Sequence, residues 1–185
     1  MEAKAKSTKI SVREICYIAM FTAIITVCAQ ISIPMPAGVP MTLQTFAIPL
    51  AGIVLGTRNG TLAALVYILL GAFGVPVFAG LTGGMAIVFG RTGGFILSFP
   101  LMALTAGIGA KKSNIAYLVL WLTIGAVINF FCGMLMFSLV NSSSLPVSFT
   151  IAVAPFIPTA VVKIAMVAAL GKPIREALEK AGAIV

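Results

Sequence analysis

Residues 113–162 have the sequence SNIAYLVLWLTIGAVINFFCGMLMFSLVNSSSLPVSFTIAVAPFIPTAVV, in which no side chain is charged. The chain has three further uncharged stretches, at residues 15–57, 59–90 and 92–110. A helix that crosses a bilayer needs about 20 apolar residues, so residues 113–162 have room for two such helices. Charged residues make up 9% of the 185-residue chain, whereas soluble domains have about 25%. These features predict an all-α integral membrane protein.

Turn-forming segments divide the chain into a predicted bundle of six transmembrane helices. The predicted helices are residues 15–33, 43–56, 62–78, 95–109, 115–140 and 149–170. We expect one transmembrane substrate-binding domain over residues 1–185. Residues 43–56 are few for a full crossing and include Pro49, so length alone also allows a re-entrant helix. Gly171 is expected to cap the last helix, and Pro173 to begin a short amphipathic segment.

Basic residues lie at every second boundary between the predicted helices. The clusters are Lys4, Lys6, Lys9 and Arg13 before the first helix, Arg58 after the second, Lys111 and Lys112 after the fourth, and Lys172, Arg175 and Lys180 after the sixth. Loops that are rich in lysine and arginine stay in the cytoplasm. The pattern predicts a multi-pass protein of the cell membrane with both termini cytoplasmic. With one span fewer, Lys111 and Lys112 would face the opposite side from the first cluster.

Several classes of function lack the residues that they need. No histidine is present, and no acidic residue lies between Glu14 and Arg175. The chain has no phosphate-binding GxxxxGK[ST] motif, no HExxH motif and no paired acids. Cys16, Cys28 and Cys132 lie inside predicted helices without metal-ligand spacing and are interpreted as small apolar residues. We therefore expect no enzymatic activity, catalytic residue, metal or cofactor. The net charge of +8 is spread over short clusters between helices, so no nucleic-acid partner is expected.

Two cations, Arg91 and Lys163, lie apart from the clusters and have no acidic residue near them in the sequence. A charge without a partner at membrane depth costs about 2.5–3.5 kcal/mol and indicates a functional site. A ligand can supply the missing anion. For Arg91 the alternative is that its side chain reaches lipid phosphates, and for Lys163 that it binds backbone carbonyls. The sequence leaves these alternatives open.

Residues 74–94, between the third and fourth predicted helices, contain seven glycines and two phenylalanines, Phe78 and Phe89. One interpretation is an ordinary flexible extracellular loop. The segment is too apolar to prefer water, however, and it contains Arg91, so we favour a lid over a ligand at the extracellular mouth.

Three amides, Gln30, Gln44 and Asn129, lie at membrane depth. Such groups most often join helices by hydrogen bonds. We favour Gln44 for ligand contact because it lies at the level of the lid. In the first helix, Ala19 and Ala23 form a row of small residues that allows close packing with another helix or subunit.

Several segments of the chain resemble the BioY family. They are QISIP (residues 30–34), VPMTLQT (39–45), GAFGVPVF (71–78), the glycines Gly83 and Gly84 with TGGF (92–95), and PFIP (155–158) followed by Lys163. The resemblance is continuous from about residue 30 to residue 99 and returns at residues 155–163. BioY proteins are the biotin-binding S components of energy-coupling factor (ECF) transporters, a type of ABC vitamin importer.

The resemblance implies a six-helix subunit that captures biotin outside the cell. It also implies an ECF transmembrane coupling subunit and two ATP-binding subunits as partners, in the lipid bilayer, and delivery of biotin by toppling of the S component. Ala19 and Ala23 correspond to the small residues that face the coupling subunit. We expect biotin to contact residues of the lid and the facing helices, namely Gln44, Phe78, Gly83, Gly84, Phe89, Arg91, Asn129 and Lys163.

The chain departs from the family pattern at two places. Where the family has Gly-Asp ahead of the helix-six lysine, this chain has Thr159 and Ala160, and many members have proline in place of Arg91. The missing aspartate removes an expected contact to the ureido ring of biotin. The alternatives are therefore an S component for a different small anionic vitamin, or a non-transporting membrane scaffold.

Overall fold

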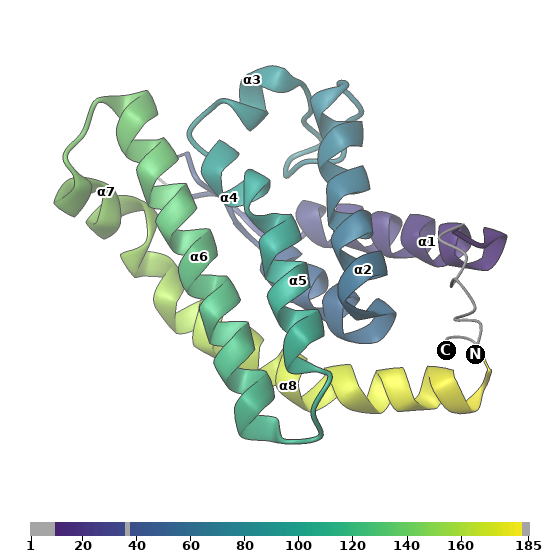
Figure 1. The fold of residues 1–185 in the computed structure, drawn as a ribbon. Helices are drawn as coiled ribbons and strands as arrows, with labels where there is room; N and C mark the ends of the chain where they lie inside the picture. Colours follow the sequence, from purple (N-terminus) through teal and green to yellow (C-terminus); the bar gives the residue numbers. More distant parts are fainter. Residues whose placement is uncertain (1–9, 36–37, 183–185) are drawn as a thin grey trace, which may run out of the picture.

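The computed structural model describes residues 10–35 and 38–182 as a bundle of helices (Figure 1). Lys4, Lys6 and Lys9 of the first cationic cluster, and residues 36 and 37 of the first loop, lie outside this description. The elements are α1 (Val12–Gln30), β1 (Ser32–Ile33), β2 (Met41–Thr42), α2 (Gln44–Ala72), α3 (Met85–Val88), α4 (Gly93–Leu97), α5 (Phe99–Gly109), α6 (Ile115–Asn141), α7 (Leu145–Ala152), the 3₁₀-helix η1 (Ala154–Phe156) and α8 (Ile157–Lys180). The prediction of an all-α bundle is confirmed, since β1 and β2 are two residues each.

Helix α2 is a hairpin of two arms rather than one straight helix. Gly56 interrupts it with φ 78° and ψ 171°, a conformation that is accessible to glycine and strained for other residues. Gln44 and Tyr67, 23 positions apart, are joined by a side-chain hydrogen bond, which a straight helix would not allow. A Cβ on Gly60 would lie 2.5 Å from the Cα of Gly52, so the arms touch at backbone distance. The second and third predicted helices correspond to these two arms, although the third ends at Ala72 instead of Phe78.

Four helical segments in the described chain are long and apolar enough to cross a membrane. They are α1, α2, α6 and the run from α7 to α8, and residues 93–109 form a shorter apolar segment. Because α2 contributes two arms, these segments correspond to the six predicted helices. Helix α5 packs between α2 and α6, and the C-terminal part of α8 runs along one end of the bundle (Figure 1).

Two of the predicted helix boundaries differ from those in the structure because of nearby proline residues. Helix α1 ends at Gln30 instead of Ile33, and Ser32–Ile33 pairs with Met41–Thr42 as a short antiparallel ladder. Pro34 favours an extended conformation in the residue before it, which opposes helix at that point. The fourth predicted helix is divided at Ser98 into α4 and α5, because Pro100 has no backbone N–H to donate across the junction.

The last predicted helix differs at both ends. It is preceded by α7 and by η1, which contains Pro155, and it continues through Gly171 and Pro173 to Lys180. The expected cap at Gly171 is therefore wrong. Gly171 serves packing instead, because a Cβ there would lie 2.7 Å from Cδ1 of Ile53.

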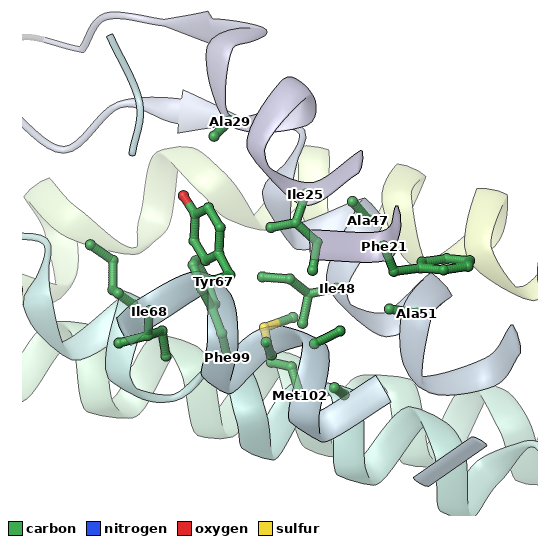
Figure 2. Packing of buried hydrophobic residues seen from close by; sticks show 14 of the residues in the cluster. Phe21, Ile25, Ala29, Ala47, Ile48, Ala51, Tyr67, Ile68, Phe99 and Met102 are labelled. Atoms are coloured by element: carbon green, nitrogen blue, oxygen red, sulfur yellow. The ribbon is translucent and has the colours of Figure 1, made fainter. Parts of the chain in front are cut away.

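The interior is packed by apolar residues from α1, both arms of α2 and α5 (Figure 2). Ile25 of α1 points toward Ile48 of α2, and Phe99 and Met102 of α5 lie on the other side of the cluster. Many other large apolar side chains lie on the surface. Such extensive exposed apolar surface is typical of a protein surrounded by lipid.

Candidate functional site

A cavity of about 420 Å³ lies between the first loop, α2, the 74–94 loop, α4 to α6 and α8. This volume is in the range of small-molecule binding sites. Its wall is mostly apolar and aromatic, with Phe95, Phe99 and Phe156 among the lining residues. Polar groups are few, and Lys163 is the cation among the lining residues.

The predicted binding residues fall into two groups. Gln44, Phe78, Asn129 and Lys163 line the cavity, and they come from four different segments of the chain. The structure therefore brings together residues that are up to 119 positions apart in the sequence (163 minus 44).

The other four predicted residues lie in the 74–94 loop but do not line the cavity. Gly83 packs against the backbone of its own loop, and Gly84, with φ 105°, precedes α3. Phe89 is exposed, and so is Arg91, whose Nη1 lies 3.4 Å from the position of a Cβ on Gly38 in the first loop. Among the described residues Arg91 has no hydrogen-bond or ion-pair partner. Contact of these four residues with a ligand stays a prediction.

Lys163 has neutral partners and no acidic one among the described residues. Its Nζ donates to the carbonyl oxygen of Thr42 at 2.6 Å and to Oγ1 of Thr45 at 3.0 Å. The alternative in which Lys163 binds backbone carbonyls thus holds in part, since it binds a carbonyl and a hydroxyl, but no acidic residue among those described neutralises its charge. An ammonium group has three N–H donors, so one remains for a ligand in the cavity.

Gln44 is held between two other side chains. Its Oε1 accepts from Oγ1 of Thr42 at 2.8 Å, and its Nε2 donates to the hydroxyl of Tyr67. Tyr67 is fully buried and donates in turn to the carbonyl oxygen of Val77 at 3.0 Å, at the start of the 74–94 loop. Sequence reasoning missed Thr42 and Tyr67. The available signal was a tyrosine in the middle of an apolar helix, because a buried hydroxyl needs a hydrogen-bond partner.

Phe78 and Thr82 enclose a tight turn at one side of the cavity. The backbone groups of these two residues exchange hydrogen bonds of 2.9 and 3.4 Å. Gly80 and Leu81 between them have positive φ values of 70° and 54°. The Phe78 ring is buried edge-on against Tyr67, with ring centroids 5.5 Å apart. Phe78 is therefore a fixed part of the cavity wall.

Asn129 hydrogen-bonds to the junction between α4 and α5. Its Nδ2 donates to the carbonyl oxygen of Phe95 at 2.9 Å and to Oγ of Ser98 at 2.7 Å. The side-chain oxygen of Asn129 accepts no hydrogen bond from a described residue, so it is free to accept one from a ligand. No group of three histidine, cysteine or carboxylate side chains that could hold a metal occurs in the described part of the chain.

Comparison with known proteins gives a consistent set of matches. The sequence model of the BioY family matches residues 2–180. A probable biotin transporter BioY of Pyrococcus horikoshii is 41% identical over 127 residues, which are 64% of this chain and 78% of that protein. The biotin transporter BioY of Rhodobacter capsulatus is 34% identical over 178 residues, 89% of this chain and 94% of that protein.

A solved structure also matches. It is the S-component for biotin from an ECF-type ABC transporter, with a TM-score of 0.82 and 25% sequence identity. The match covers 93% of this chain and 95% of that one.

We predict that Tyr67→Phe lowers the free energy of unfolding by about 1–3 kcal/mol, because it removes the hydroxyl that satisfies Gln44 inside the bundle. Thermal unfolding in detergent measures the effect. Tyr117→Phe is the control, since the Tyr117 hydroxyl makes no hydrogen bond with a described residue. Equal melting temperatures for the two variants would show that the Tyr67 hydroxyl does not stabilise this region.

Proposed function

The chain belongs to the BioY family, and on that basis we propose that it is the biotin-binding S component of an ECF-type transporter, which captures biotin outside the cell. The members to which it is similar are transporters and not enzymes. The observation that carries the proposal is the cavity, in which an ammonium group with no acidic partner among the described residues meets aromatic walls. Such a site suits a small organic anion with apolar rings.

Biotin has the chemistry that these groups can bind. Its carboxylate accepts charge-assisted hydrogen bonds, its ureido oxygen accepts further ones, and its sulfur-containing ring and valeryl chain are apolar. In this proposal Arg91, beside the first loop, binds the carboxylate, and Lys163 donates its free N–H to the ureido oxygen. The reverse assignment is the direct alternative. Gly83, Gly84 and Phe89 belong to the loop that covers the ligand.

Helix α1 offers a face for the coupling subunit. Ala19 and Ala23 are exposed, whereas Phe21 and Ile25 on the same helix are buried in the core. Small residues on an exposed helix face allow close approach of a second helix. We infer that the ECF coupling subunit docks here, that two ATP-binding subunits complete the transporter, and that the S component topples to deliver biotin.

An S component for a different small anionic vitamin is the second candidate, and Ala160 is the observation that favours it. Ala160 lines the cavity on the same helix as Lys163, where the family pattern has an aspartate. A methyl group there cannot accept a hydrogen bond from the ureido N–H groups. Lipoate, a carboxylate with an apolar ring and no ureido group, discriminates between the candidates. Tighter binding of lipoate than of biotin would favour the second one.

We predict that replacing the cation that binds the carboxylate, by Arg91→Ala or by Lys163→Ala, weakens biotin binding at least tenfold, because loss of the partner of a desolvated charge costs about 2–5 kcal/mol. Isothermal titration with biotin and biotin methyl ester measures both affinities. The ester should lose less affinity than biotin when the cation that binds the carboxylate is replaced. Lys111→Ala, outside the cavity, is the control. Parental affinity in both Arg91→Ala and Lys163→Ala would refute this use of the two cations.

Ala19→Leu and Ala23→Leu should reduce co-purification with the coupling subunit several-fold while leaving biotin binding near the parental value. The added bulk separates helices that pack through small residues. Pull-down with a tagged coupling subunit measures assembly, and titration measures biotin binding. The control is Val119→Leu, which enlarges an exposed residue of α6. Full assembly of both alanine variants would contradict docking on this face.

With both termini cytoplasmic, a cysteine introduced at residues 142–144 should react with a membrane-impermeant thiol reagent added to intact cells. A cysteine next to Lys112 should react only after permeabilisation, because lysine-rich loops stay in the cytoplasm. The background protein should lack Cys16, Cys28 and Cys132, which are free thiols. The opposite labelling pattern would reverse the orientation.

A further inference from the structure

The side chain of Gln30 bonds to the turn that walls the cavity. Gln30 is the last residue of α1, and its Nε2 lies 3.1 Å from the carbonyl oxygen of Thr26, 3.3 Å from that of Val77 and 3.1 Å from that of Phe78. Its Oε1 accepts from the backbone N–H of Leu81 at 2.9 Å. The amide therefore uses both its donor and its acceptor side on residues 77–81.

These contacts differ from ordinary bonding between helices. The partners of Gln30 in the turn are all backbone groups, and one of them, the N–H of Leu81, belongs to a residue with positive φ. Leu81 is one of two non-glycine residues with positive φ in the described chain, and such a conformation costs about 1–3 kcal/mol unless its surroundings hold it. Among the described residues, Gln30 supplies the side-chain hydrogen bond that stabilises Leu81 from outside the turn, by accepting from its backbone N–H.

The turn held by Gln30 is part of the binding site. Phe78, Ala79 and Thr82 line the cavity, while the Leu81 side chain is 69% exposed and packs little. Tyr67 also donates to Val77, but no second side chain from another element bonds at Phe78 or Leu81 in the described residues. Packing against Tyr67 fixes Phe78, and in the described residues the Gln30 amide is thus the side chain of another element that hydrogen-bonds to the more exposed part of the turn, at Leu81.

We propose that Gln30 is a positioning residue that holds the 78–82 turn closed over the bound ligand and so sets how slowly the ligand leaves. The inference rests on the proposed biotin-binding function and adds a residue that does not line the cavity. Loss of the amide frees the Leu81 N–H and two carbonyl groups, and the turn then opens more often. The ligand dissociation rate should rise more than the association rate.

Two variants and a matched control test the proposal. Gln30→Leu removes all the hydrogen bonds at similar volume, and Gln30→Glu keeps the acceptor for Leu81 but places a negative charge against the carbonyls of Val77 and Phe78. Asn141→Ala is the control, because Asn141 is also an amide at the end of a helix, yet among the described residues it donates only to the local carbonyl of Phe137, at 2.9 Å.

The measurements are hydrogen–deuterium exchange of the 79–82 segment without ligand, the dissociation rate of labelled biotin, and the melting temperature of the whole protein. We expect exchange at Leu81 to be at least tenfold faster in Gln30→Leu, and biotin release at least fivefold faster in both Gln30 variants. Asn141→Ala should match the parent in both readouts. The melting temperature shows whether the Gln30 variants remain folded.

Release at the parental rate in the folded Gln30 variants overturns the proposal, whether or not exchange is faster. If Gln30→Leu does not fold, Gln30→Glu decides by the same criterion; if neither folds, Gln30 has a general structural role and the proposal fails. A parent protein that binds no biotin overturns the proposed function and the inference together. A parent that binds biotin while its variants retain it equally well overturns the inference alone.

Discussion

A chain of hydrogen bonds beside the cavity joins elements that are distant in the sequence. It begins at Lys163 of α8 and passes through Thr42, Gln44 and Tyr67 to the carbonyl oxygen of Val77. Gln30 then connects the same carbonyl to the end of α1. In a bilayer no water is available to satisfy these groups, so each must find its partner inside the protein. The polar groups beside the cavity are therefore held by partners from distant segments of the chain.

Close packing at glycines allows this chain of hydrogen bonds to form. A Cβ on Gly71 would overlap the Phe78 ring, and one on Gly133 would overlap the ring of Phe95. Both phenylalanines line the cavity. Glycine therefore makes room at the helix surface for the aromatic walls of the site. The same principle operates in α2, where Gly52 and Gly60 bring the two arms together and thereby bring Gln44 to Tyr67.

Several cations at the end of the bundle opposite the cavity bind carbonyl oxygens. Arg175 donates to the carbonyl of Ile53 at 3.1 Å, near the end of the first arm of α2, and Lys172 donates to that of Lys112 at 2.7 Å. Arg13 donates to the carbonyl of Gly182. The last carbonyls of a helix have no partner within it. Residues expected only to mark the membrane surface thus also hold the C-terminal part of α8 against the bundle, where Ile174 and Leu178 pack on the core.

The sequence by itself determined the fold class, the number of helices and the family. Long uncharged runs and alternating clusters of lysine and arginine predict the fold class and the number of helices, because both reflect the cost of placing charge in a bilayer. The family follows from the resemblance of motifs such as those at residues 39–45 and 71–78. The sequence also singled out, as candidate binding residues, four that line the cavity: Lys163, Gln44, Phe78 and Asn129. Charged, polar and aromatic residues are conspicuous in such apolar runs. Local patterns were misleading at Gly171, where a residue typical of helix ends instead packs against Ile53 within a continuous helix.

Only the tertiary structure decided which of the predicted residues surround the cavity. Lys163 lines it and binds Thr42 and Thr45, whereas Arg91, equally unusual in the sequence, lies outside beside Gly38. The roles of Tyr67 and Gln30 likewise follow from hydrogen bonds to residues that are distant in the sequence. A hydrogen bond depends on distances of about 3 Å between groups that the chain separates by tens of residues. Such distances are set by how the helices pack, and no property of the individual residues specifies them.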